Sequence, residues 1–250
     1  MSPWVLRLVV ANVAVFLLTA SLPETTGLLA LVPAAVLLRP WTLVTYMFVH
    51  ANLMHILLNM LGLYFFGPRM EGRLGGRHFL GLYFLSGIAG AVLTFVLAPH
   101  AVVVGASGAV MGVLAGYARF WPEDRIYIWG VLPVSARVMV IGLAVYSIAM
   151  GSGLLGGGGG VAHYAHLGGL VAGWLYVLGL ERQRGPARKV PWELPGAARA
   201  RSERWARIRP EELHEVNRAE VERLLARVRE EGPRSLTEPE RVFLDRMAPP

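Results

Sequence analysis

The sequence predicts an all-α polytopic membrane protein, in which a bundle of six transmembrane helices precedes a short helical tail. The 250 residues are 54% hydrophobic and only 16% charged, whereas a soluble domain carries about 25% charged residues. Charge is also uneven, because residues 1–180 hold eight of the 24 Lys and Arg and four of the 17 Asp and Glu. This composition excludes disorder and an ordinary soluble enzyme, and the absence of cysteine from the sequence excludes a secreted disulfide scaffold.

The six spans follow from apolar runs near the length of about 20 residues that a membrane crossing needs. They are residues 4–22, 52–69, 78–97, 106–121, 131–150 and 162–180. Residues 28–38 are apolar but too short to cross, and Pro33 interrupts them. We expect an interfacial segment there, within a long first loop.

Arginine counting predicts the orientation, since cytoplasmic loops carry the excess of basic residues. With the N-terminus inside, the outer side receives only Arg39. The inner side receives Arg7, Arg69, Arg73, Arg77, Arg119, Arg125 and Arg137. Both termini are then cytoplasmic. This topology accounts for the net charge of +7, so the lipid bilayer is the expected partner and nucleic acid is not.

Glycines recur every three or four residues in two spans, a spacing that lets helix backbones approach closely. The series are Gly105, Gly108, Gly112 and Gly116 in the fourth span and Gly169 and Gly173 in the sixth. We expect these two spans to be closely packed.

Polar side chains inside spans are costly in lipid and therefore mark candidate functional sites. Four such residues fall toward the outer side: His55 and Asn59 in the second span, Ser107 opening the fourth, and His166 opening the sixth. Each alone has an ordinary structural explanation, such as packing or an interhelical hydrogen bond. Their common depth makes a joint catalytic role the sharper hypothesis.

The chemistry expected of this set is acyl transfer. Ser107 lies between glycines at a helix start, where free amide groups favour a developing oxyanion. A serine hydroxyl needs a neighbouring base, and His166 is the candidate. His55 and Asn59 are four residues apart on one helix face and offer oxyanion donors beside the Ser107 amide.

Three segments together carry a resemblance to a known family. They are His50-Ala-Asn-Leu-Met-His55-Ile-Leu-Leu-Asn59-Met, Gly105-Ala-Ser107-Gly108 and Ala165-His166-Leu-Gly-Gly169-Leu. In this order, over roughly residues 39–180, they resemble the rhomboid family of intramembrane serine proteases in its bacterial six-helix form. The resemblance implies a bacterial inner (cell) membrane location and single-pass membrane proteins as substrates.

The resemblance also implies roles for individual residues. Ser107 is the nucleophile, and His166 is the general base and acid. His55, Asn59 and the Ser107 amide stabilise the oxyanion. Structural support falls to His50, Glu71, Gly105, Gly108 and Gly169. Two positions depart from the family pattern: Met111 stands where some members have a tyrosine packed on the catalytic histidine, and Arg39-Pro40-Trp41 replaces the Trp-Arg pair of the first loop.

The remaining chain predicts a flexible connection and a tail. Five glycines at 156–160 form a loop that is either a simple linker or a mobile cap for substrate entry. Residues 1–180 are expected to form the membrane domain, 181–209 a basic linker and 210–250 a small cytoplasmic helical hairpin with an unknown partner. One helix of the hairpin has an apolar stripe of Val221, Leu224, Leu225 and Val228, and the next is expected to bury Val242, Phe243 and Leu244 or Met247.

Alternatives from other classes remain open at this point. A catalytically inactive rhomboid-like protein could bind membrane clients with the same fold. A transporter would explain the intramembrane His and Asn, but not Gly-Ala-Ser-Gly. A zinc protease could use His50, His55, His163 and His166, but the sequence has no His-Glu-x-x-His motif. We therefore expect no metal and no cofactor.

Overall fold

The structure is a computed structural model that describes residues 2–128, 130–154, 161–183, 202–213, 215–236 and 238–249. It divides into two compact units, Met1–Gln183 and Arg184–Pro250, which are described separately. The glycine loop at 156–160, most of the predicted linker and the predicted helix cap at Thr237 lie outside the described residues.

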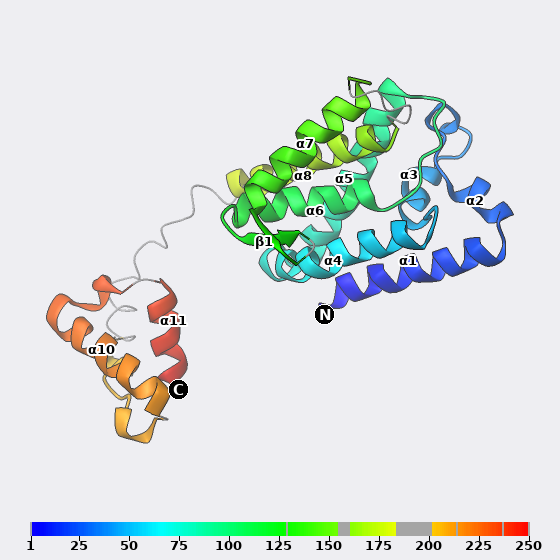
Figure 1. Cartoon of the computed structure of the whole chain (residues 1–250). Helices are drawn as coiled ribbons and strands as arrows, with labels where there is room; N and C mark the ends of the chain where they lie inside the picture. The colour runs from blue at the N-terminus through cyan, green and yellow to red at the C-terminus, as the bar shows by residue number, and fades with distance from the viewer. Residues whose placement is uncertain are drawn as a thin grey trace. The chain divides into compact units, whose positions relative to one another are not determined.

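The first unit is built almost entirely from helices (Figure 1). Its described elements are α1 (Pro3–Ser21), α2 (Glu24–Leu29), η1 (Pro33–Ala35), α3 (Thr42–Thr45), η2 (Tyr46–Phe48), α4 (Leu53–Leu74), α5 (Gly76–Leu97), α6 (Ser107–Phe120), β1 (Arg125–Ile128), β2 (Leu132–Ser135), α7 (Ala136–Gly151) and α8 (Val161–Gln183).

Within the described residues, length and composition qualify α1 and α5 as membrane spans. A third span is present if α3, η2 and α4 are counted together as one crossing with a bend of 97° between η2 and α4. The sequence predicted six. The difference arises because α6 and α7 have 14 and 16 residues, below the length of about 20 that a crossing needs. Helix α8 is not among the helices that qualify within the described residues.

The all-α prediction missed a β-hairpin, and the predicted span 131–150 begins too early. Strands β1 and β2 pair antiparallel, with Arg125 opposite Ser135 and Tyr127 opposite Pro133. Gly130 adopts a positive φ of 72° in the turn. Leu132 precedes Pro133, and the residue before a proline favours extended backbone. Ser135 caps α7, because its hydroxyl accepts a hydrogen bond from the Val138 amide at 3.4 Å. The helix therefore starts at Ala136.

Helix α6 lies at the centre of the unit, against α4, α5, α7 and α8 (Figure 1). Ten of its 14 residues are buried, as expected for a helix that is apolar on nearly every side. Glycines set its distance from α8. A Cβ on Gly169 would lie 2.7 Å from the Gly108 carbonyl carbon, and one on Gly173 would lie 2.7 Å from that of Gly112. The two backbones are therefore in direct contact.

Glu71 joins α4 to the start of α1. Its buried carboxylate accepts hydrogen bonds from the Ser2 hydroxyl at 2.6 Å, the Trp4 amide at 3.1 Å and the Val5 amide at 3.0 Å. The first amides of a helix have no partner within the helix. Glu71 therefore caps α1 from a distant point in the chain.

The first loop is held to its own backbone by the side chains of Arg39 and Trp41. The Arg39 guanidinium donates to the Gly27 carbonyl and the Trp41 indole donates to the Leu28 carbonyl, both at 2.9 Å. An isolated bridge between Leu31 and Val103 then ties the loop to the segment that precedes α6.

The second unit has its own small core. It contains η3 (Pro210–Glu212), α10 (Glu215–Glu231), η4 (Pro233–Ser235) and α11 (Glu238–Met247). Trp205 and Ile208, from the stretch expected to be linker, are buried in this core, and the Trp205 indole donates to Asp245 at 2.9 Å. The predicted core residues Val221, Leu224, Leu225 and Leu244 are buried there. Val242 was predicted to be buried but is 41% exposed, because the face formed by Leu244 points inward instead.

Candidate active site

Ser107 and His166 meet at the ends of two closely packed helices. Ser107 is the first residue of α6, and His166 lies in the second turn of α8. The His166 Nε2 is 2.7 Å from the Ser107 Oγ, and both side chains are half-buried. This is hydrogen-bond distance for proton transfer from a hydroxyl to an imidazole.

The turn before Ser107 depends on Gly105. This residue has a φ of +111°, and its amide donates to the Tyr46 carbonyl at 2.9 Å. A Cβ on Gly105 would lie 2.5 Å from the His55 Nε2. Only glycine combines this backbone conformation with this approach to the His55 ring.

His50 supports the same turn. Its Nε2 accepts from the Ala106 amide at 3.5 Å, and its Nδ1 lies 3.2 Å from the Phe48 carbonyl oxygen. These two contacts fit the tautomer that is protonated at Nδ1. The His50 ring also packs edge-on against His55, with centroids 5.1 Å apart.

His55 and Asn59 are placed differently from one another. The His55 Nδ1 faces the Ala51 amide at 3.4 Å, which leaves the Nε2 proton toward the Gly105 turn. The buried Asn59 amide donates to the His55 carbonyl at 2.9 Å. Among hydrogen bonds between described residues, none joins Asn59 to Ser107, so the structure brings His55 to the turn and leaves Asn59 bonded within its own helix.

A cluster of arginines and aromatic rings occupies the other ends of these helices. The guanidinium of Arg69, late in α4, lies 4.0 Å from the Trp121 ring centroid and also contacts Asp124. Arg73 stacks on Phe120 at 5.0 Å. Ser107 and Phe120 are the two ends of α6, which is about 20 Å long. The candidate site and the arginine cluster therefore lie at opposite ends of α6.

Asp124, in the segment after α6, is the acidic member of this cluster. It accepts from the Tyr117 hydroxyl at 2.7 Å. That hydrogen bond and the Arg69 guanidinium hold the pKa of Asp124 below its ordinary value. The carboxylate thus stays ionised near neutral pH and fastens the ends of α4 and α6 together.

Two aromatic side chains near His166 were missed by the sequence reasoning. The His163 ring lies edge-on to His166 with centroids 6.0 Å apart, and Tyr146 of α7 lies edge-on to His163 at 5.2 Å. The available signal was the spacing, since His163 is one helical turn before His166. Sequence reasoning had considered His163 only as a zinc ligand. In the described part of the chain, no group of three His, Cys, Asp or Glu residues could hold a metal.

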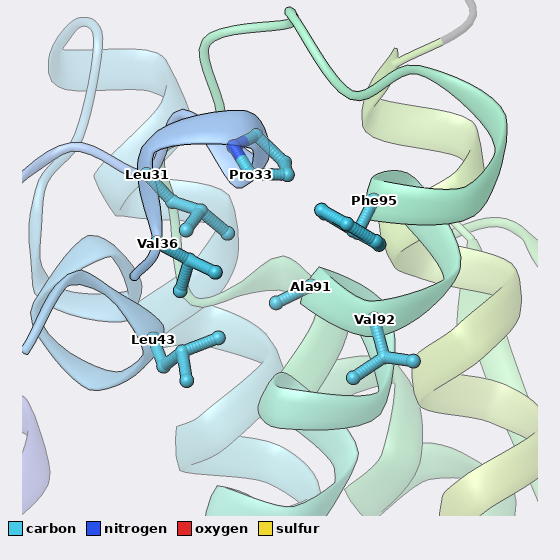
Figure 2. A pocket seen from close by; sticks show the side chains of 7 residues that line it. All are labelled: Leu31, Pro33, Val36, Leu43, Ala91, Val92 and Phe95. Carbon is cyan, nitrogen blue, oxygen red and sulfur yellow. The ribbon is translucent and has the colours of Figure 1, made fainter. Parts of the chain in front are cut away.

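A separate apolar hollow of about 200 Å³ lies between the first loop and α5 (Figure 2). Leu31, Pro33 and Leu43 line it from the loop side, and Ala91 and Phe95 line it from α5. Its lining offers no polar side chain, so it has no chemistry of its own.

The family model described as "Rhomboid domain" matches residues 38–183. "Rhomboid-like protease 3" of Toxoplasma gondii is 32% identical over 58% of this chain and 53% of its own length. "Rhomboid protein 1, mitochondrial" of Saccharomyces cerevisiae is 35% identical over 55% of this chain and 42% of its own length.

A plant relative shows the same level of similarity. "RHOMBOID-like protein 4" of Arabidopsis thaliana is 34% identical over 54% of this chain and 32% of its own length. The chain therefore matches a third to a half of the length of these three relatives.

Proposed function

The chain belongs to the rhomboid family of membrane proteins, which includes intramembrane proteases, and on this premise we propose that it is an intramembrane serine endopeptidase. It cleaves transmembrane or juxtamembrane segments of other membrane proteins. The observation that carries the proposal is the 2.7 Å contact between the Ser107 hydroxyl and the His166 imidazole at the start of α6.

The proposed reaction proceeds through an acyl-enzyme. The Ser107 Oγ attacks the peptide carbonyl carbon while His166 Nε2 takes the hydroxyl proton. His166 then gives this proton to the leaving amine as the peptide C–N bond breaks. Water, deprotonated by His166, attacks the ester, and the acid product leaves as the proton returns to Ser107.

The groups around Ser107 supply the oxyanion contacts in this proposal. The Ser107 amide lies in the first turn of α6, where helix amides lack partners within the helix. His55 adds an Nε2 donor from the side of the Gly105 turn. The Asn59 side-chain amide has two N–H groups, and the one that does not bond the His55 carbonyl is the donor that Asn59 contributes in this proposal.

The proposed topology has six crossings with both termini in the cytoplasm of a bacterial cell. The arginine cluster at the far end of α6 supports this orientation, since basic residues gather on the cytoplasmic side. The short α6 is enclosed by neighbouring helices, so it need not meet lipid along its length. Water reaches Ser107 from the outer side.

The proposed substrate is a single-pass helix that unwinds near the outer interface. A peptide bond inside a formed helix is shielded by its own side chains, so the Ser107 Oγ reaches its carbonyl carbon only after local unwinding. Small or helix-weakening residues around the cleaved bond favour this step.

The test uses the purified full-length chain in phospholipid bilayers and a fluorescent fluorophosphonate, which reacts with activated serines. We expect labelling of the wild type and none of Ser107→Ala or His166→Ala. Cleavage of a single-pass test protein should be lost in the same variants. A folded wild type that is neither labelled nor active on the test protein contradicts the proposal and favours a client-binding, inactive member of the family. Labelling that survives Ser107→Ala also contradicts it.

A further inference from the structure

Three aromatic rings form a row from α7 to the candidate base. Tyr146 of α7 lies edge-on to His163 of α8, with ring centroids 5.2 Å apart and planes at 83°. His163 in turn lies edge-on to His166, with centroids 6.0 Å apart and planes at 89°. Both distances fall in the range at which perpendicular aromatic rings attract one another.

His166 needs a group that fixes its orientation. In a Ser-His-Asp triad the carboxylate holds the imidazole in the correct tautomer and direction. Within the described residues, no Asp or Glu hydrogen-bonds to the His166 ring. The half-buried Met111 offers a flexible thioether with no plane to match. A planar neighbour therefore has to come from elsewhere.

His163 contacts its neighbours through the edges and face of its ring and not through a hydrogen bond at its Nδ1. This nitrogen is buried and has no hydrogen-bond partner among the described residues. A buried polar atom without a partner is costly and rare. Hydrogen bonding at Nδ1 therefore does not explain the ring's position, whereas contact with the two neighbouring rings does.

We propose that His163 is a positioning residue for His166, held from its other side by Tyr146. This inference rests on the proposed function, since it assigns a role in that reaction. One neighbour of His163 thus belongs to a different helix, so the direction of the candidate base depends on the contact between α7 and α8.

The test compares substitutions that keep or remove the ring. His163→Phe keeps a planar ring and removes both nitrogens, whereas His163→Leu fills similar volume without a plane and His163→Ala removes both. Labelling by a fluorophosphonate and cleavage of a single-pass test protein are measured together with the thermal unfolding midpoint. The exposed His100→Ala serves as the matched control for loss of a histidine.

We expect His163→Phe to react within about threefold of wild type, because its ring preserves both edge contacts. His163→Leu and His163→Ala should lower kcat about 10- to 100-fold with little change in KM, the loss typical of a displaced catalytic group. Tyr146→Phe should match wild type, and Tyr146→Ala should lose about two- to tenfold. If His163→Ala does not fold, the comparison of His163→Phe with His163→Leu still decides whether a ring is needed at this position.

Two results would overturn the inference. Leu and Phe variants that react equally fast would remove any need for a ring. A Phe variant that is as slow as Leu at an unchanged unfolding midpoint would assign the effect to a nitrogen atom. A wild-type protein that is not labelled overturns the proposed function and this inference with it. A wild-type protein that is labelled normally, with His163→Leu and His163→Ala variants that react as fast, overturns the inference alone.

Discussion

Replacing Gly169 with alanine is expected to slow the reaction of Ser107 by forcing α8 away from α6. The added methyl group would lie 2.7 Å from the Gly108 carbonyl carbon and 3.0 Å from the Gly108 Cα. Both are backbone atoms, which have no alternative rotamer. The Gly108 carbonyl oxygen lies closer still. Carbon atoms in contact need about 3.5 Å, so the helices have to separate by at least about 0.8 Å.

The separation acts directly on the candidate site, because Gly108 follows Ser107 and Gly169 is one helical turn after His166. A shift of this size lengthens the 2.7 Å contact to about 3.5 Å, beyond the range of about 3.0 Å for hydroxyl hydrogen bonds. A misplacement of about 1 Å costs up to 100-fold in rate. We expect a 10- to 100-fold slower reaction and a destabilisation of about 1–3 kcal/mol from overpacking.

The assay is the rate of fluorophosphonate labelling per folded molecule, with the folded fraction taken from thermal unfolding. Gly179→Ala on the same helix is the matched control, since a Cβ there meets nothing within 4 Å. It should label like wild type and gain up to about 1 kcal/mol from helix propensity. A folded Gly169→Ala that labels at the wild-type rate would refute the reasoning, as would a Gly179→Ala that is slowed equally.

Three further predictions follow. Glu71→Ala leaves two backbone amides at the start of α1 without partners and should lower the free energy of unfolding by about 2–4 kcal/mol in denaturant titrations. Gly105→Ala should slow labelling strongly, because the new methyl group would be strained by the positive φ and would also clash with the His55 ring. Gly75 has a positive φ but no atom near its Cβ position, so Gly75→Ala should lower the stability of the fold without slowing labelling. The pKa of Asp124 is held low in the folded protein. The stability that this carboxylate contributes is therefore present above about pH 4 and is lost as the pH falls through its lowered pKa. Asp124→Asn should remove this pH dependence from the thermal unfolding midpoint.

Each of these three predictions would be contradicted by a specific result. An unchanged unfolding free energy in Glu71→Ala would mean that water or another group satisfies the α1 amides equally well. Equal labelling of the two glycine variants would assign no role to the ring beside Gly105. Parallel pH curves for wild type and Asp124→Asn would show that the carboxylate gains nothing from its neighbours on folding.

The helical stretches were predictable because apolar composition over about 20 residues identifies a buried or membrane helix. The predicted span 162–180 lies within α8, and 106–121 matches α6 within one residue at each end. Composition alone could not separate the hairpin from the helix that follows it, since residues 131–150 are mostly apolar on both sides of the boundary. Pro133 and the cap at Ser135 were the local signals for that boundary.

The site was predictable in outline and not in detail. Counting loop arginines predicted a common depth for Ser107 and His166, and the structure brings the two side chains into contact. The row of Tyr146 and His163 depends on the rotation of α7 against α8, which periodicity does not specify. The bond from Asn59 to the His55 carbonyl likewise depends on a rotamer and not on spacing.

The cap that Glu71 provides for α1 has a consequence for the order of synthesis. The carboxylate is separated from the Val5 amide by 66 residues. At about 5–20 residues per second, the ribosome adds Glu71 roughly 3–13 seconds after the helix start it caps. Throughout that interval the first amides of α1 lack the Glu71 carboxylate and depend on other acceptors, so the cap of α1 is completed only after α4 has been synthesised.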